Sequence, residues 1–156
     1  MSTQRYWPPS ASSLSESMRD IGYSLATAIA DIIDNSITAD STEIDVFCDL
    51  TKDSPTLCII DNGHGMSETD LLLAMKHGAI SPKQERNPHD LGRFGLGMKT
   101  ASFSQCRCLS VASSKNSTLC GAEWDLDLVS QEDKWVLSIL DEQEVKDLPY
   151  INRVPT

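Results

Sequence analysis

The chain has 156 residues, of which 40% are hydrophobic, so it can form one domain with one core and is too short for a second full domain. Its formal net charge of −10 disfavours nucleic-acid binding by this stretch, because such binding depends on lysine and arginine displacing counterions from phosphates. No apolar run approaches the roughly 18 residues that span a bilayer, and the first residues lack a signal pattern, so we expect a cytoplasmic protein with no membrane segment.

The chain begins with an irregular arm that is followed by two predicted helices. Residues 1–12 are rich in Pro and Ser and are expected to form the arm, with the folded domain over 13–156. A short helix fits 13–19. A stronger helix is predicted over 23–38, because apolar residues recur there every three or four positions and Ser24 can cap its first turn.

Two strands and a third helix are predicted next. Apolar and polar residues alternate over 44–50, and a polar turn leads to an apolar run over 57–60, which favours an antiparallel pair. Ser67 is placed to cap the following helix, whose first turn carries acidic residues. The stretch 77–93 is polar, and we expect it to be a long loop that serves as a lid.

The remaining elements set the fold class. A helix is expected over 99–104, and three strands are predicted after it, over 109–112, 119–128 and 135–140. Helices that lead the chain and strands that cluster later indicate an α+β fold. We therefore expect a two-layer sandwich in which helices cover one face of a mostly antiparallel sheet.

The cysteines give little sign of a metal site or of a disulfide framework. There are five of them, an odd number, which is typical of reduced thiols. Cys106 and Cys108 have a spacing that could form half of a zinc site, but no second Cys or His pair at zinc-binding spacing accompanies them. We favour the interpretation that these cysteines are reduced and pack in the core.

Three motifs carry residues suited to chemistry, and the first is DIIDNS within the strong helix. Asp31 and Asn35 are four residues apart and so project from one face of that helix. One side chain is a potential base, and the other is a potential metal or phosphate ligand. Taken alone, these polar residues could equally be the solvated end of the helix.

The second motif is IIDNGHGMS, where an apolar strand ends at Asp61 and breaks into glycines before a helix begins. A fixed aspartate can accept a hydrogen bond from an exocyclic amine, and the missing side chains at Gly63 and Gly65 are expected to leave room for a flat ring. A plain Asn-Gly turn is the alternative. That alternative gives no role to Gly65 and Met66.

The third motif is LGRFGLGMKTAS. Gly92, Gly95 and Gly97 precede a predicted helix whose first turn contains Lys99 and Thr100, which is an arrangement suited to binding phosphate. A dinucleotide fingerprint needs G-x-G-x-x-G after a first strand, whereas the order here is G-x-x-G-x-G after a polar loop. A Walker loop needs Gly-Lys-Ser/Thr, and a methionine separates the last glycine from the lysine. Both common nucleotide motifs are disfavoured.

In this order, AIADIIDNS, DNGHGMS and GRFGLGMKTAS resemble the N box and the two glycine boxes of GHKL ATPases, the superfamily of gyrase, the heat-shock chaperone, sensor histidine kinases and MutL. The resemblance covers roughly residues 15 to 130 and is strongest, around the second glycine box, to MORC-like and heat-shock-chaperone-like members. It implies a Bergerat-type ATP-binding fold with ATP and Mg²⁺ as cofactors.

The resemblance also implies roles for individual residues. Asn35 would coordinate the Mg²⁺ that bridges the ATP phosphates, and Asp61 would bind the adenine amine. Gly63, Gly65 and Met66 would shape the adenine pocket.

The same resemblance assigns the third motif to the phosphates. Gly92, Gly95 and Gly97 would let the lid close over them, with Lys99 and Thr100 as phosphate contacts.

One departure from the family pattern bears on catalysis. The family's general base is a glutamate four residues before the asparagine, and this sequence has Asp31 there, which is one methylene shorter. Hydrolysis of ATP is therefore expected to be slow.

Lys83 in the lid can reach phosphate, although an exposed loop lysine is the more ordinary interpretation. The family's adenine-contacting threonine strand has no clear match before Thr156, which predicts that the domain is truncated at its C-terminal end.

Three functions stay open at this point. The first is an ATPase module whose slow hydrolysis drives lid closure and nucleotide-dependent homodimerisation of a larger protein, with a protein client or DNA bound through regions outside this chain. The second is a kinase of the histidine or serine branch, disfavoured because His64, His77 and His89 all lie in loops or near the ATP site. The third is a non-hydrolysing ATP-sensing interaction module, which the shorter base makes credible.

Overall fold

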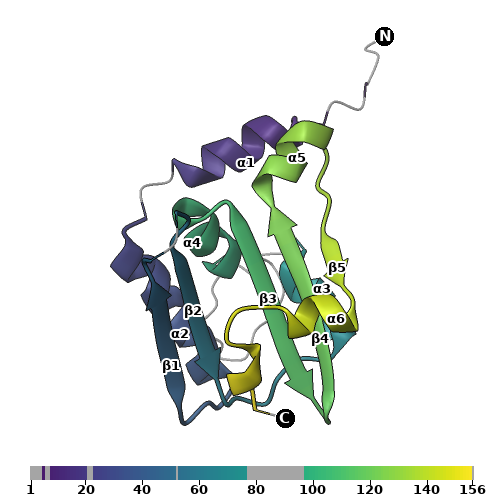
Figure 1. Ribbon diagram of the computed structural model, residues 1–156. Helices are drawn as coiled ribbons and strands as arrows, with labels where there is room; N and C mark the ends of the chain where they lie inside the picture. Colours follow the sequence, from purple (N-terminus) through teal and green to yellow (C-terminus); the bar gives the residue numbers. More distant parts are fainter. Residues whose placement is uncertain (1–4, 6–7, 21–22, 52, 77–96, 156) are drawn as a thin grey trace.

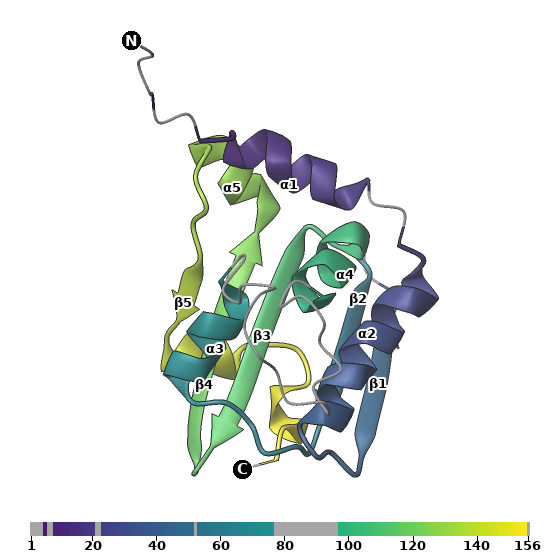
Figure 2. The ribbon, with the colours of Figure 1, turned by 180° about the vertical axis from the view of Figure 1, so that it is seen from behind.

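The strands form a single layer with helices on both of its faces, most of them on one. The structure is a computed structural model that describes residues 5, 8–20, 23–51, 53–76 and 97–155. Strands β1 and β2 form one sheet, and β3, β4 and β5 form a second sheet in the order β3-β4-β5. Figure 1 shows the two sheets side by side in one layer, and Figure 2 shows α2, α3 and α4 covering the same face. The predicted α+β fold is confirmed.

The first sheet is the antiparallel pair expected from the alternation of apolar and polar residues. Strand β1 spans Ile44–Asp49 and β2 spans Thr56–Asp61. The register places Phe47 opposite Cys58 and Ile44 opposite Asp61. Asp61 is therefore the last residue of its strand, at the edge where the chain turns back toward the helical layer.

The helix over residues Leu25–Thr38, α2, carries the first motif. It begins two residues after the predicted start, because Ser24 is its N-cap: the Ser24 side chain accepts a hydrogen bond from the Thr27 N–H and so caps the first turn, as expected. Its most buried side chains are Ala28 and Ser36. A serine with 3% of its surface exposed needs a polar partner, and Ser36 finds one in the site described below.

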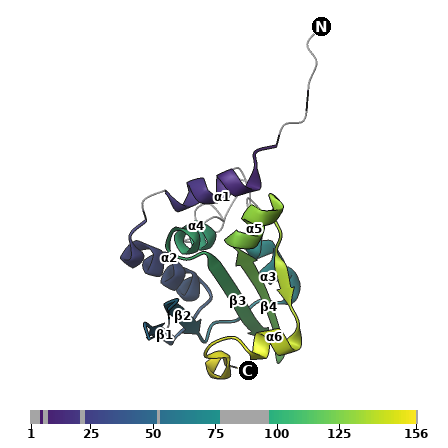
Figure 3. The ribbon, with the colours of Figure 1, turned by 45° about the horizontal axis from the view of Figure 1, so that its top comes forward.

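Two further helices complete the face that α2 begins. Helix α3 spans Glu68–Met75, and Ser67 and Asp70 close a capping box at its start. Helix α4 spans Gly97–Gln105, two residues earlier than the predicted start. In Figure 3, α4 lies beside α2. Residues 77–93, predicted to form the lid, lie outside the described residues.

Helices α1 and α5 close one end of the strand layer. Helix α1 spans Ala11–Arg19 and α5 spans Leu126–Glu132. Asp133, just after α5, accepts hydrogen bonds from the Ser10 hydroxyl and the Ser12 N–H, so it links the end of α5 to the start of α1. These hydrogen bonds connect the two helices, which lie against each other in Figure 1.

The second sheet differs from the prediction at both of its later strands. Strands β3 and β4 span Cys108–Lys115 and Thr118–Asp125, whereas β5 is only Ser138–Leu140. The predicted strand over 119–128 is wrong after Asp125, because the Asp125 side chain accepts hydrogen bonds from the next backbone N–H groups and starts α5.

The other face of the layer carries two short elements that the sequence pattern did not predict. Helix α6 spans Glu142–Lys146, and a 3₁₀ turn, η1, spans Ile151–Arg153. Tyr150 stacks on Phe47 of β1 with ring centroids 4.7 Å apart, and the Arg153 guanidinium lies over the same ring. The C-terminal part of the chain, yellow in Figure 1, thus contacts the first sheet through Phe47.

The hydrophobic core lies between the second sheet and the helices on its covered face. It is built of Ala11, Leu71, Met75, Phe103, Cys120, Ala122, Trp124, Leu126 and Val129. All five cysteines are free. Among the described helices, none combines the length and the apolar composition needed to cross a membrane.

Candidate functional site

The Asp61 carboxylate is held in a defined orientation at the end of β2. The Ser36 hydroxyl, on α2, donates to Oδ2 at 2.8 Å, and the Gly63 N–H donates to Oδ1 at 2.9 Å. Each carboxylate oxygen therefore accepts one hydrogen bond from these two residues and has capacity for another. The bond to Ser36 joins the second motif to the first.

The two glycines of the second motif are required by the protein itself. A Cβ at Gly63 would lie 2.8 Å from the Ala39 carbonyl oxygen, after α2. Gly65 has φ of +66°, and a Cβ there would lie 1.9 Å from the Ser114 carbonyl oxygen on β3. The expectation that these absent side chains leave room for a flat ring is corrected, because protein atoms occupy the space.

The rest of the second motif is anchored in the same way. The Met66 N–H donates to the Ser113 hydroxyl at 2.7 Å, and the Met66 side chain lies against the core. The Asn62 side-chain oxygen accepts from the N–H groups of Thr42 and Glu43, at 2.9 and 3.0 Å. The loop is thereby fixed to β3 on one side and to the turn before β1 on the other, so Asp61 sits on a rigid support.

Asp31 and Asn35 lie on α2, as predicted, and have different surroundings. Asp31 is partly buried, and its Oδ2 accepts a hydrogen bond from the Tyr23 hydroxyl at 2.9 Å. Asn35 is exposed, and its side-chain amide makes no hydrogen bond with any described residue. On this face of α2, a hydrogen bond from Tyr23 orients the carboxylate of Asp31, whereas the amide of Asn35 is exposed among the residues that the structure describes.

The start of α4 carries the described part of the third motif. Gly97 begins the helix and Thr100 is partly buried. Lys99 is only 2% exposed, and its ammonium donates to the Ala74 carbonyl oxygen at 2.6 Å, at the end of α3. Burial lowers the pKa of Lys99 below its ordinary value. The lysine therefore contacts protein in this structure. Gly92, Gly95 and Lys83 lie outside the described residues.

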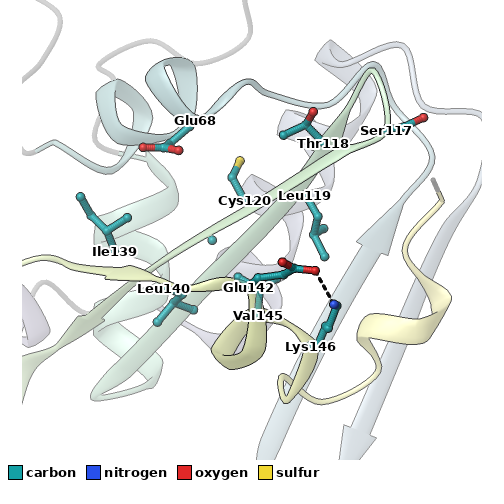
Figure 4. Close-up of a pocket in the computed structure, with 11 residues that line it drawn as sticks. Glu68, Ser117, Thr118, Leu119, Cys120, Ile139, Leu140, Glu142, Val145 and Lys146 are labelled. Carbon is teal, nitrogen blue, oxygen red and sulfur yellow. Dashed lines mark hydrogen bonds and ion pairs between the residues drawn. The ribbon is translucent and has the colours of Figure 1, made fainter.

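A cavity of about 450 Å³ lies elsewhere, at the edge of the second sheet. Figure 4 shows it bordered by Glu68 of α3, by β4 around Cys120, by Ile139 of β5 and by α6. Glu142 and Lys146 form an ion pair on its rim. None of the motif residues lines this cavity, so it has no part in the candidate site.

Two residues of this region were not found by sequence reasoning. Ser36 is four residues after Ile32 and eight after Ala28, so helical periodicity already placed it on the buried face, where a hydroxyl needs a partner. Tyr23 precedes the helix and gave no periodic signal. Its contact with Asp31 depends on how the chain enters α2, which the pattern of residues does not specify.

The site thus brings the end of β2, which carries Asp61, against α2, the helix that carries Asp31 and Asn35. The sequence model of the family described as histidine kinase-, DNA gyrase B-, and HSP90-like ATPase matches residues 23–155. The chain belongs to this family.

Individual relatives agree with this assignment. The chain is 32% identical over 95 residues to ATPase MORC2B of Mus musculus, a match that covers 59% of this chain and 9% of the relative. It is 32% identical over 79 residues to ATPase MORC2 of Homo sapiens, covering 49% and 8%. The DNA mismatch repair protein MutL of Geobacillus sp. (strain WCH70) is 32% identical over 97 residues, covering 60% and 15%. The aligned part is thus a small fraction of each relative.

Proposed function

We propose that this chain binds ATP together with Mg²⁺ and hydrolyses it slowly. The observation that carries the proposal is the orientation of Asp61, whose two oxygens are held by Ser36 and Gly63 and retain hydrogen-bonding capacity. A carboxylate fixed in this way selects a ligand with a donor at one place, such as the exocyclic amine of adenine. Family membership supports the same ligand.

The available donor set suits Mg²⁺. Magnesium prefers oxygen ligands and is commonly held by one or two protein groups together with substrate phosphates. The exposed Asn35 amide oxygen can provide one such ligand. Within the described residues, no group of three acidic, histidine or cysteine side chains could hold a metal by itself. A cation held mainly by phosphates, with Asn35 as protein ligand, fits that arrangement, and it would neutralise the phosphate charge.

The phosphates are assigned to the start of α4. The first N–H groups of a helix have no partner within it and carry partial positive charge, which favours anions near Gly97 and Thr100. The role of Lys99 as a phosphate contact stays a prediction that requires its ammonium to leave the Ala74 carbonyl. Gly92 and Gly95 keep the roles implied by the family, and a phosphate contact from Lys83 stays a prediction beside the more ordinary interpretation of an exposed loop lysine.

Asp31 is the proposed general base. It would orient and deprotonate the water that attacks the terminal phosphate, and its short side chain makes the rate low. We propose that this slow step times closure of the domain and nucleotide-dependent dimerisation of a larger protein, which binds a protein or DNA through other regions. The names of the relatives, ATPase MORC2 and DNA mismatch repair protein MutL, support ATP hydrolysis and a role that involves DNA.

Titration calorimetry with a non-hydrolysable ATP analogue, with and without Mg²⁺, tests the binding proposal. Asp61→Asn keeps the side-chain shape but replaces one acceptor with a donor, so the analogue should bind at least about tenfold more weakly. Asp53→Asn is the matched control, because Asp53 is an exposed aspartate in the turn between β1 and β2. Unchanged affinity in a folded Asp61→Asn protein would contradict the adenine assignment.

A further inference from the structure

Tyr23 is held at both ends, between α2 and α4. Its hydroxyl donates to Asp31 Oδ2 at 2.9 Å. Its backbone carbonyl accepts a hydrogen bond from the Gln105 side-chain amide at 2.8 Å, at the end of α4. Tyr23 directly precedes Ser24, the N-cap of α2, so it spans the first two turns of that helix to reach Asp31, eight residues later.

This contact suits a residue that aims a carboxylate without neutralising it. A general base needs a free oxygen that faces the water it activates, and an aspartate held at one oxygen by a donor presents the other in a fixed direction. A lysine or arginine in the same place would form an ion pair and weaken the base. A phenol is a neutral donor, so it orients the carboxylate without forming an ion pair with it.

The titration of the phenol agrees with this geometry. The hydrogen bond to Asp31 raises the pKa of Tyr23 above its ordinary value of 10.0, and burial and the charge of Asp31 act in the same direction. The hydroxyl is therefore protonated, and available as a donor, throughout the neutral range.

We propose that Tyr23 is a positioning residue for the general base: it aims Asp31 at the attacking water, and Gln105 sets the position of Tyr23 from α4. The role rests on the proposed function, because it requires Asp31 to act in ATP hydrolysis. It also connects the base on α2 to the helix assigned to the phosphates. A change in the position of α4 would be transmitted to the base through Gln105 and Tyr23.

Hydrolysis and binding measured separately test the proposal. Tyr23→Phe should lower kcat about tenfold, while the affinity for the non-hydrolysable analogue and the midpoint of thermal unfolding stay unchanged. Tyr150→Phe is the matched control, since Tyr150 stacks on Phe47 by its ring. Adding Tyr23→Phe to Asp31→Asn should lower the residual rate no further, because the tyrosine acts through the aspartate.

A spectroscopic titration examines the contact without hydrolysis. In a background where Tyr6 and Tyr150 are phenylalanine, the ultraviolet absorbance of the phenolate reports Tyr23 alone. Asp31→Asn should move the pKa of Tyr23 down toward 10.0, whereas Asp34→Asn, on the same helix but exposed, should not. The same titration in both variants would show that the hydrogen bond is absent and would overturn the proposal.

The outcomes separate this inference from the function on which it rests. A Tyr23→Phe protein that hydrolyses ATP at the parent rate overturns the positioning role alone. That role is also overturned if the substitution still lowers the rate in the Asp31→Asn background, or if the parent binds the analogue without Asp31-dependent hydrolysis. A folded parent that does not bind the analogue overturns the proposed function itself.

Discussion

Asp61 and Lys99 are both charged residues of family motifs, yet the structure places them in opposite situations. Asp61 ends a strand with each carboxylate oxygen accepting one hydrogen bond, and it keeps further capacity for a ligand. Lys99 is buried, and its ammonium donates to the end of α3. A motif therefore identifies residues that act together in a family without specifying which of them face the ligand and which hold the helices.

The largest effect is expected from a change that breaks the support of Asp61. Gly65→Ala would place a Cβ 1.9 Å from the Ser114 carbonyl oxygen at a backbone φ of +66°. The backbone at Gly65 or at Ser114 has to move to relieve this clash. The free energy of unfolding, measured by urea unfolding, should therefore fall by about 3 kcal/mol or more.

Gly121→Ala is the control for this substitution. Its Cβ would lie 2.7 Å from Val145 Cγ2, the end of a side chain that can shift, so the loss of stability should be smaller. An equal loss in the two variants would show that the contact of Gly65 with β3 has no special weight.

A smaller effect on stability is expected at Lys99. It tests whether Lys99 holds the helices, whereas Asp61 faces the ligand. Lys99→Met keeps much of the volume but leaves the Ala74 carbonyl without its donor, so stability should fall by about 1–3 kcal/mol. Affinity for the ATP analogue should change less than it does in Asp61→Asn. The reverse order of affinities, measured calorimetrically on the folded variants, would show that Lys99 faces the phosphates once ATP is bound.

Some features of the fold and of the site could be predicted from the sequence alone. Helix α2, the β1–β2 pair and the start of α3 follow from short-range signals, namely periodicity, alternation and the Ser24 and Ser67 caps. The positions of Asp31 and Asn35 on one helix face follow from the same periodicity.

Contacts between distant segments could not be read in this way. The hydrogen bond from Lys99 to Ala74 depends on how α3 and α4 pack, and the one from Tyr23 to Asp31 depends on how the chain enters α2. The end of β4 was misjudged because Asp125 lies within an apolar alternating run and acts as a cap only once the backbone turns. These features belong to tertiary structure, which local pattern does not encode.

The smallest effect concerns the other end of the helix that Lys99 holds. The pKa of Asp70 lies below its ordinary value of 3.8, first because of the hydrogen bond from the Ser67 hydroxyl, then that from the Ser67 N–H and the contact with Lys115. A lowered pKa in the folded state means that the carboxylate stabilises the protein above about pH 3.8, and that this contribution disappears as the pH falls through the lowered value.

Asp70→Asn should therefore be slightly less stable than the parent near neutral pH and should approach it below about pH 3.8, in urea unfolding across that range. Asp53→Asn controls for the loss of one negative charge from a chain of net charge −10. A stability difference between Asp70→Asn and the parent that is constant with pH would mean that the ionised carboxylate adds nothing to the cap. Helix α3 would then depend on its buried end, where Lys99 and the Trp124 indole N–H donate to successive carbonyl groups.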